Sequence, residues 1–166
     1  ERIVASGAAS IGLLGSTGTY AYLTPKARKN ATKVAVQVVA GRTPLIVGVG
    51  AMRTDLAVTL AQDAAHAGAD ALLMAPVSYT PLFDEEVAQH YIAVADATDL
   101  PLCIYNNPST THFTFSHDLI ARLARHPRIK AVKMPLPKGP ITSAVDTPRN
   151  FTTRETITVC ISNVPN

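Results

Sequence analysis

Residues 11–24 read IGLLGSTGTYAYLT, an apolar run followed by two hydroxyl residues between glycines. The apolar run predicts a strand starting at Ile11, and Thr24 with Pro25 predicts the N-cap and first turn of a helix. A plain turn at this point would more often use Asn-Gly or Pro-Gly. The hydroxyl residues Ser16 and Thr17 at the end of a strand therefore indicate the floor of a binding pocket.

The same unit, a strand followed by a helix, recurs along the chain at intervals of roughly 30 residues, the size of one βα unit. Predicted strands begin at Ile11, Pro44, Ala71, Leu102 and Ile129, and predicted helices span Thr24 to Ala40, Thr54 to Ala67, Asp84 to Ala97 and Ser116 to Arg125. Apolar strands separated by helices predict an α/β protein with a parallel sheet. A doubly wound sheet and a (β/α)8 barrel both satisfy this pattern.

Polar residues at the strand ends favour the barrel. Each predicted strand ends with residues that a packed core does not need: Ser16 and Thr17, Gly48 to Gly50, Ser78 and Tyr79, Tyr105 and Asn106, and Lys133. In a barrel these ends converge on one mouth that carries the chemistry. A doubly wound sheet usually places one glycine-rich phosphate loop after its first strand instead. We therefore expect part of a (β/α)8 barrel.

Composition excludes several classes of protein. The chain has 166 residues, 47% hydrophobic and 16% charged, which is typical of a folded domain rather than a disordered segment. Its net charge of +3 is spread without a basic run, which argues against nucleic-acid binding. No apolar stretch has the roughly 18 residues of a membrane helix. Two cysteines without metal-like spacing fit a reducing compartment, and we expect a cytoplasmic protein.

Lys133 is the sharpest chemical signal. In IKAVKMP, the period of two places Ile129, Ala131 and Lys133 on one face of the strand. If that face points to the barrel axis, burial favours the neutral amine, which is a nucleophile for carbonyl carbons. The alternative is a lysine whose stem is buried and whose ammonium reaches water at the sheet edge.

Tyr105 strengthens the chemical interpretation of Lys133. It lies near the end of the preceding strand, LCIYNNP, on the same face as Cys103. A phenol there can pass a proton to and from a carbonyl oxygen while Lys133 attacks the carbon. The alternative is a core tyrosine whose hydroxyl bonds the backbone. The combination of Lys133, Tyr105 and the hydroxyls of Ser16 and Thr17 favours a catalytic role over a structural one.

Five motifs at the strand ends, GSTG, GVGA, APVSY, YNNPS and AVKMP, agree in order and spacing with one family. The chain resembles the dihydrodipicolinate synthase/N-acetylneuraminate lyase superfamily of pyruvate-type Schiff-base aldolases from about Ile3 to Pro137. The resemblance implies a (β/α)8 barrel, usually tetrameric, in which a lysine forms an imine with pyruvate or a related 2-oxo acid that then reacts with an aldehyde. It implies no cofactor or metal.

The resemblance also implies roles for individual residues. Lys133 would form the imine, and Tyr105 would shuttle protons. Ser16, Thr17 and the backbone of Gly18 would hold the carboxylate of the keto acid, with Thr17 in a hydroxyl relay toward Tyr105. Tyr79 is the nearest match to a tyrosine that completes this relay across a subunit contact, with Ser78 competing for the position, and Asn106 would contact the substrate.

Two departures from the family pattern change the expectation. Thr110 stands where the synthases carry an arginine for the carboxylate of the second substrate, which favours a sugar-acid or related aldolase over lysine-pathway synthesis. The chain is also short for a barrel of about 250 residues. We expect it to hold strands two to six in a domain over 1–137, with two unpaired sheet edges. The tail over 138–166 diverges, and only Ile157 to Ile161 fits a strand.

Three functions follow from these observations. The first is a Schiff-base aldolase or lyase that uses Lys133 and Tyr105. The second is an inactive remnant of the family, in which an unclosed barrel leaves Lys133 solvated. The third is a phosphate-binding α/β domain that uses the glycines of GSTG and GVGA, although neither stretch matches a phosphate-loop fingerprint.

Overall fold

The computed structural model describes residues 1–135, 152–153 and 156–160. Five parallel strands lie in chain order, β1 (Ile11–Leu13), β2 (Leu45–Gly48), β3 (Ala71–Met74), β4 (Leu102–Tyr105) and β5 (Ile129–Pro135). The main helices between them are α2 (Pro25–Val39), α3 (Thr54–Ala67), α4 (Asp84–Asp96) and α6 (His117–Ala124). Short helical turns complete this part of the chain: α1 (Arg2–Ala5), η1 (Ser16–Gly18), η2 (Tyr20–Tyr22) and α5 (Pro108–Thr111).

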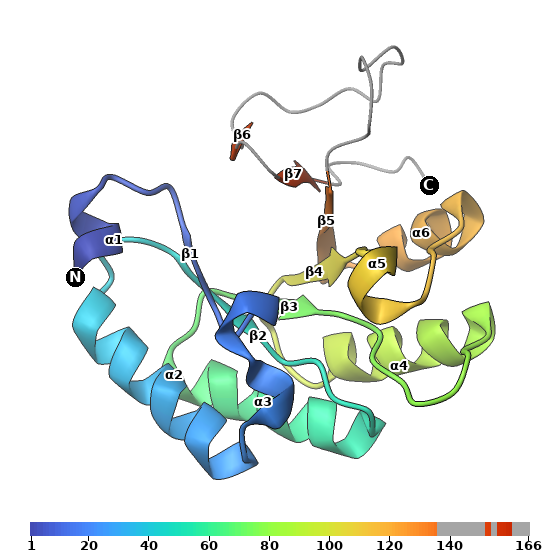
Figure 1. Ribbon diagram of the computed structural model, residues 1–166, viewed down its shortest axis with the longest axis horizontal. Coiled ribbons are helices and arrows are strands. Elements are labelled where there is room, and N and C mark those ends of the chain that lie inside the picture. Colours follow the sequence, from blue (N-terminus) through green and yellow to red (C-terminus); the bar gives the residue numbers. More distant parts are fainter. Residues whose placement is uncertain (136–151, 154–155, 161–166) are drawn as a thin grey trace.

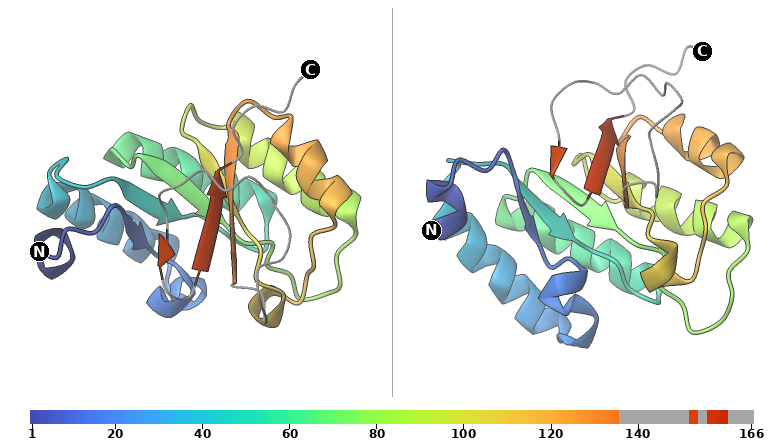
Figure 2. Two further views of the ribbon diagram at one scale, coloured as in Figure 1. Left: turned by 90° about the horizontal axis from the view of Figure 1, so that it is seen from above. Right: turned by 45° about the horizontal axis from the view of Figure 1, so that its top comes forward.

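All four main helices cover the same face of the sheet, side by side in chain order (Figure 1). A doubly wound sheet would have helices on both faces, so the arrangement is that of a segment of a (β/α)8 barrel, as predicted. The two views in Figure 2 show that none of these helices covers the opposite face of the sheet. That face corresponds to the inside of a barrel, and it carries a cavity of about 270 Å³ that Ile46, Cys103 and Ala131 help to line.

The core lies between the strands and the helices. Alternate strand residues such as Leu45, Val47, Leu72 and Ile104 are almost fully buried against the helices. The residues between them, including Leu73 and Cys103, are only partly buried because they point to the open face. The sheet therefore separates a packed outer layer from an inner face that is available for a site.

Helix ends form where the sequence predicts them. The Thr24 side chain accepts a hydrogen bond from the Ala27 N–H at 3.2 Å, and the Ser116 side chain accepts one from the Leu119 N–H at 3.1 Å. The Glu86 carboxylate accepts a hydrogen bond from the Phe83 N–H at 2.8 Å at the start of α4. These side chains satisfy backbone donors that a helix leaves unpaired.

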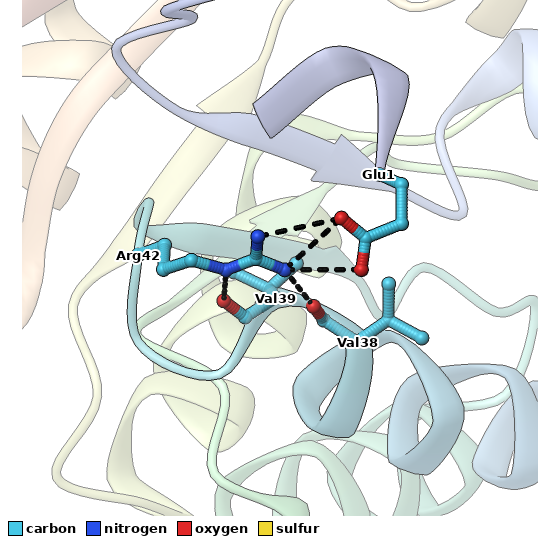
Figure 3. Close-up of polar contacts among 4 residues, drawn as sticks. All are labelled: Glu1, Val38, Val39 and Arg42. Atoms are coloured by element: carbon cyan, nitrogen blue, oxygen red, sulfur yellow. Dashed lines mark hydrogen bonds and ion pairs between the residues drawn. The ribbon is translucent and has the colours of Figure 1, made fainter. Parts of the chain in front are cut away.

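The start of the chain is tied to the end of α2 by one arginine. Arg42 donates from Nε to the Val39 carbonyl at 3.0 Å and also to the Val38 carbonyl, and its guanidinium pairs with the Glu1 carboxylate at 3.2 Å (Figure 3). The hydrogen bond and the charge of Arg42 lower the pKa of Glu1. A cation at this position also suits the negative end of the helix dipole.

The prediction that Ile129, Ala131 and Lys133 share one face of β5 is wrong for Ile129. The pairing with β4 shifts by one residue after Leu102, so Leu102 lies opposite Ile129 while Cys103 lies opposite Ala131. The extra residue, Lys130, interrupts the alternation, and Ile129 packs in the core on the helix side. Lys133 still shares its face with Ala131, because both follow the irregularity.

The prediction of two unpaired sheet edges is wrong for the edge formed by β5, because another strand pairs with it. The strand β7 (Thr156–Cys160) pairs antiparallel with β5, and β6 (Thr152–Thr153) pairs with β7. The pairing covers the β5 edge, and β7 coincides with most of the stretch predicted as a strand. Residue 161, residues 136–137 of the expected domain and the rest of the expected tail lie outside the described residues.

Candidate active site

Lys133 and Tyr105 lie side by side on the inner face of the sheet. They are register partners on β5 and β4, and the Lys133 Nζ lies 4.0 Å from the centroid of the Tyr105 ring. This distance is within the range of a cation–π contact. Lys133 is half-buried, so its amine is reachable from the open face. The structure brings together the amine and the phenol that the sequence analysis predicted to act as a pair.

The Tyr105 hydroxyl accepts two hydrogen bonds, one from the loop that follows β1 and one from the loop that follows its own strand, β4. The Asn107 Nδ2 donates to it at 2.9 Å, and the Ser16 Oγ donates at 3.4 Å, which is long for a bond between hydroxyls. Burial raises the pKa of Tyr105, but the bonds from Ser16 and Asn107 and the charge of Lys133 outweigh it and lower that pKa. A phenol with a lowered pKa releases its proton more readily, as a proton donor requires.

The GSTG stretch forms the short helical turn η1 rather than the start of a long helix. The Gly18 N–H donates to the Gly15 carbonyl at 2.9 Å, and the Thr19 N–H donates to the Ser16 carbonyl at 3.1 Å. The N–H groups of Ser16 and Thr17 open the turn, where a helix has no internal partner for them. Ser16, Thr17 and Gly18 are exposed, so the turn presents hydroxyls and amides at the mouth.

The predicted site residues do not all converge. Ser16, not Thr17, makes the side-chain hydrogen bond to Tyr105, and none from Thr17 occurs among the described residues. Tyr79 is 96% exposed on the loop after β3, and its side chain contacts none of the other predicted site residues in the described part of the chain. Asn106 is buried, and its N–H donates to the Lys133 carbonyl at 2.9 Å. Asn106 thus joins β4 to β5, whereas its neighbour Asn107 reaches the phenol.

The sequence interpretation missed two residues, Arg28 and Tyr20. Arg28 is 5% exposed on α2, and it donates to the Gly48 carbonyl at 2.9 Å and the Gly50 carbonyl at 3.0 Å. Its guanidinium lies 5.0 Å from the centroid of the Tyr20 ring. The signal in the sequence was weak, since an arginine in the first turn of a helix is usually exposed.

Gly48 and Gly50 allow neighbouring backbone and side-chain atoms to approach the end of β2 closely. A Cβ at Gly48 would lie 2.0 Å from the Leu14 carbonyl oxygen, and one at Gly50 would lie 3.1 Å from both the Ala75 carbonyl and the Tyr20 hydroxyl. Only glycine permits the first approach. The glycines of the GVGA motif therefore serve close packing at the mouth.

The geometry suits carbonyl chemistry better than the alternatives. An amine, a phenol with a lowered pKa and a turn with exposed amides lie at one end of the sheet. No group of three or more His, Cys, Asp or Glu side chains gathers as a metal site would need within the described residues. Over the same residues, no helix is both long and apolar enough to cross a membrane.

Comparison with known proteins supports the same family. The sequence model described as "Dihydrodipicolinate synthetase family" matches residues 1–145, which extends past Pro137. A 4-hydroxy-tetrahydrodipicolinate synthase from Hyphomonas neptunium is 38% identical over 133 residues, which are 80% of this chain and 45% of that protein.

Two solved structures extend the comparison to the fold. The crystal structure of dihydrodipicolinate synthase from Agrobacterium tumefaciens superposes with a TM-score of 0.80 at 59% identity, over 82% of this chain and 46% of that one. The chloride-inhibited dihydrodipicolinate synthase from Acinetobacter baumannii, complexed with pyruvate, has a TM-score of 0.75 at 35% identity, over 81% of this chain and 47% of that one. The chain spans about half the length of the relatives it matches.

Proposed function

The chain belongs to the dihydrodipicolinate synthetase family, and from this premise we propose that Lys133 forms an imine with pyruvate or a related 2-oxo acid. The bound keto acid would then make or break a carbon–carbon bond with an aldehyde. One observation carries the proposal: the Lys133 amine lies 4.0 Å from the ring of Tyr105, whose hydroxyl is held by Ser16 and Asn107. The pyruvate complex of the related synthase supports this choice of keto acid.

The proposed reaction follows from these positions. The neutral amine of Lys133 attacks the ketone carbon, and the ketone oxygen becomes a hydroxyl on the carbinolamine. Tyr105 donates a proton to that hydroxyl, which leaves as water and produces the iminium. The iminium draws electrons from the adjacent carbon, so a proton passes from that carbon to water and leaves an enamine. The enamine carbon attacks the aldehyde carbon, and the aldehyde oxygen takes a proton from water to become a hydroxyl. The exposed amides of Ser16 and Thr17 would bind the carboxylate.

The aldehyde partner is proposed from Thr110. This residue is exposed on α5, and its hydroxyl lacks the two-pronged donor geometry with which arginine binds a carboxylate. We therefore propose an aldehyde without a carboxylate at this position, such as a sugar aldehyde, although the related proteins named above are synthases. Tyr79, exposed beyond β3, would contact a neighbouring subunit in a homotetramer.

Borohydride trapping tests the imine directly. The full chain is incubated with pyruvate and borohydride, and peptides are mapped by mass spectrometry for a carboxyethyl group on lysine. We expect the adduct on Lys133 in wild type and in Lys130→Met, and none in Lys133→Met. Lys130 is a matched control because it is an exposed lysine on the same strand. A folded wild-type chain without an adduct would contradict the proposal and favour the inactive remnant.

A further inference from the structure

A third residue with a hydroxyl, Tyr20, lines the same small cavity as Ser16 and Tyr105. The cavity has a volume of about 10 Å³, and Ser16, Tyr20 and Tyr105 line it together with Gly48 and Gly50. A space of this size takes about one water molecule. Tyr20 comes from η2, so this phenol belongs to the same chain as Tyr105.

Tyr20 is held in place by contacts on two sides. The Arg28 guanidinium lies against its ring at 5.0 Å from the centroid, and Arg28 is itself anchored to two backbone carbonyls. The Tyr20 hydroxyl lies 3.1 Å from the point where a Cβ of residue 50 would stand. Because residue 50 is glycine, the hydroxyl approaches the backbone there without the tight contact that a Cβ would bring.

The hydroxyl of Tyr20 is available for a further partner. The ring is half-buried, and no hydrogen bond of the hydroxyl occurs within the described residues. Burial raises the pKa of Tyr20, the charge of Arg28 lowers it, and ionised Tyr105 raises it again. The two phenols are thus close enough for the charge of one to affect the other. Within the described residues, the charged and titratable groups around the pair are Arg28, beside Tyr20, Lys133, beside Tyr105, and the buried Tyr91, whose pKa is raised by burial and also by the charge of Tyr20.

Building on the imine chemistry proposed above, we propose that Tyr20 is a positioning residue for Tyr105. Its hydroxyl ends a chain that runs from Tyr105 through Ser16 and one water molecule. Tyr105 becomes a phenolate when its proton leaves with the carbinolamine hydroxyl as water. Tyr20 returns a proton along the chain, and it takes one back from solvent at its exposed side.

This route operates within a single chain. The distance of 3.4 Å between the Ser16 and Tyr105 oxygens is long for a direct bond, and a water molecule in the cavity beside them shortens each step. Tyr79, by contrast, is 96% exposed. Proton return through Tyr20 therefore requires no residue of a second subunit.

Two phenylalanine variants test the proposal, each removing one hydroxyl and keeping the ring. Tyr22 is the matched control for Tyr20, because it lies on the same helical turn and is 90% exposed. The rate of the Lys133 adduct with pyruvate is measured across pH. We expect Tyr20→Phe to slow it about tenfold, a fraction of what a full proton donor supplies, and to alter its pH profile. Tyr22→Phe should match wild type.

A second measurement does not depend on activity. Tyrosine labelled with ¹³C at Cζ is titrated by NMR, and the pKa of Tyr20 should fall in Tyr105→Phe because the neighbouring phenolate is absent. Equal adduct rates in Tyr20→Phe and Tyr22→Phe would overturn the inference. If wild type forms no adduct, the proposed function fails, and the titration then decides alone: an unchanged Tyr20 pKa overturns the hydroxyl chain, and a lowered one supports it.

Discussion

Gly48 shows at the scale of one residue how backbone packing shapes the mouth of the site. Leu14, which directly follows β1, adopts a left-handed φ of 57°, and its carbonyl points at the Cα of Gly48. A left-handed leucine is uncommon and costs conformational energy. The loop before GSTG therefore depends on the absence of a side chain on β2.

The variant Gly48→Ala tests this contact. Its Cβ would lie 2.0 Å from the Leu14 carbonyl oxygen, so we expect a loss of about 3 kcal/mol in the free energy of unfolding. Gly12→Ala is the matched control, because no heavy atom lies within 4 Å of its Cβ, and it should stay within about 1 kcal/mol of wild type. Denaturant titration measures both. Equal stabilities would show that the loop has room to move.

The Tyr105 phenol offers a second test at this scale. Burial raises the pKa of Tyr105. The hydrogen bonds from Ser16 and Asn107 and the charge of Lys133 together have a larger, opposite effect, so the pKa is lowered. Removing the cation in Lys133→Met should therefore raise the pKa of Tyr105, observed by ¹³Cζ NMR or by the ultraviolet absorbance of the phenolate. Lys130→Met should leave it unchanged. A Tyr105 pKa that does not respond to Lys133→Met would mean that the two groups are farther apart in solution.

At the scale of elements, neighbouring helices are joined by exposed ion pairs. Arg122 on α6 donates to the Glu85 carboxylate on α4 at 2.5 Å, and Ser116 before α6 donates to Asp84 at 2.9 Å. The hydrogen bonds from Arg122 and Gln89 and the charge of Arg122 lower the pKa of Glu85 from 4.5 to about 2. These contacts link α6, the last described helix, to α4.

The pair makes the α4–α6 contact depend on pH. A carboxylate whose pKa is lower in the folded state contributes stability above its unfolded pKa, and this contribution is lost as the pH falls through the folded pKa. The difference in stability between wild type and Arg122→Gln should therefore be largest near neutral pH and shrink from about pH 5 to pH 2. Denaturation at several pH values measures it.

Arg125→Gln is the control for this prediction. Arg125 ends the same helix and forms no ion pair in the described part of the chain. Its effect on stability should not change over the same pH range. A constant difference for Arg122→Gln would contradict the role of Glu85.

At the scale of the whole molecule, the sheet is built from two kinds of pairing. The strands β1 to β5 are parallel, and β7 joins β5 in the antiparallel direction, with Thr158 opposite Lys133. Parallel strands need long crossovers, whereas an antiparallel strand can join an edge directly. The strand that carries Lys133 is therefore paired on both sides.

Hydrogen exchange tests this arrangement in the full chain. Proline has no N–H to donate to the ladder. Every second residue of an antiparallel strand donates to the same neighbouring strand, so changing two consecutive residues removes one such donor in either register. The double variant Thr158→Pro/Val159→Pro should therefore break the β5–β7 ladder and speed amide exchange in β5. Exchange in β2 and β3, which lie away from that edge, should stay as in wild type. Unchanged exchange in β5 would show that β7 does not protect it.

Much of the fold follows from local sequence. The predicted helix over Thr54 to Ala67 is α3 without change, and the predicted helix from Thr24 to Ala40 is α2 with its two caps. Such agreement is expected where apolar periodicity and capping residues coincide. The short turns η1, η2 and α5 were not predicted, because three or four residues carry no periodic signal.

The amino-acid sequence by itself determined the βα repeat, the parallel sheet and the pairing of Lys133 with Tyr105, because these depend on period and strand order. Only the tertiary structure decided that Ser16 rather than Thr17 bonds Tyr105, that Lys130 interrupts β5, and that Arg28 holds Tyr20 at the mouth. These features depend on distances between segments far apart in the chain. Such distances are set by packing, which no local pattern records.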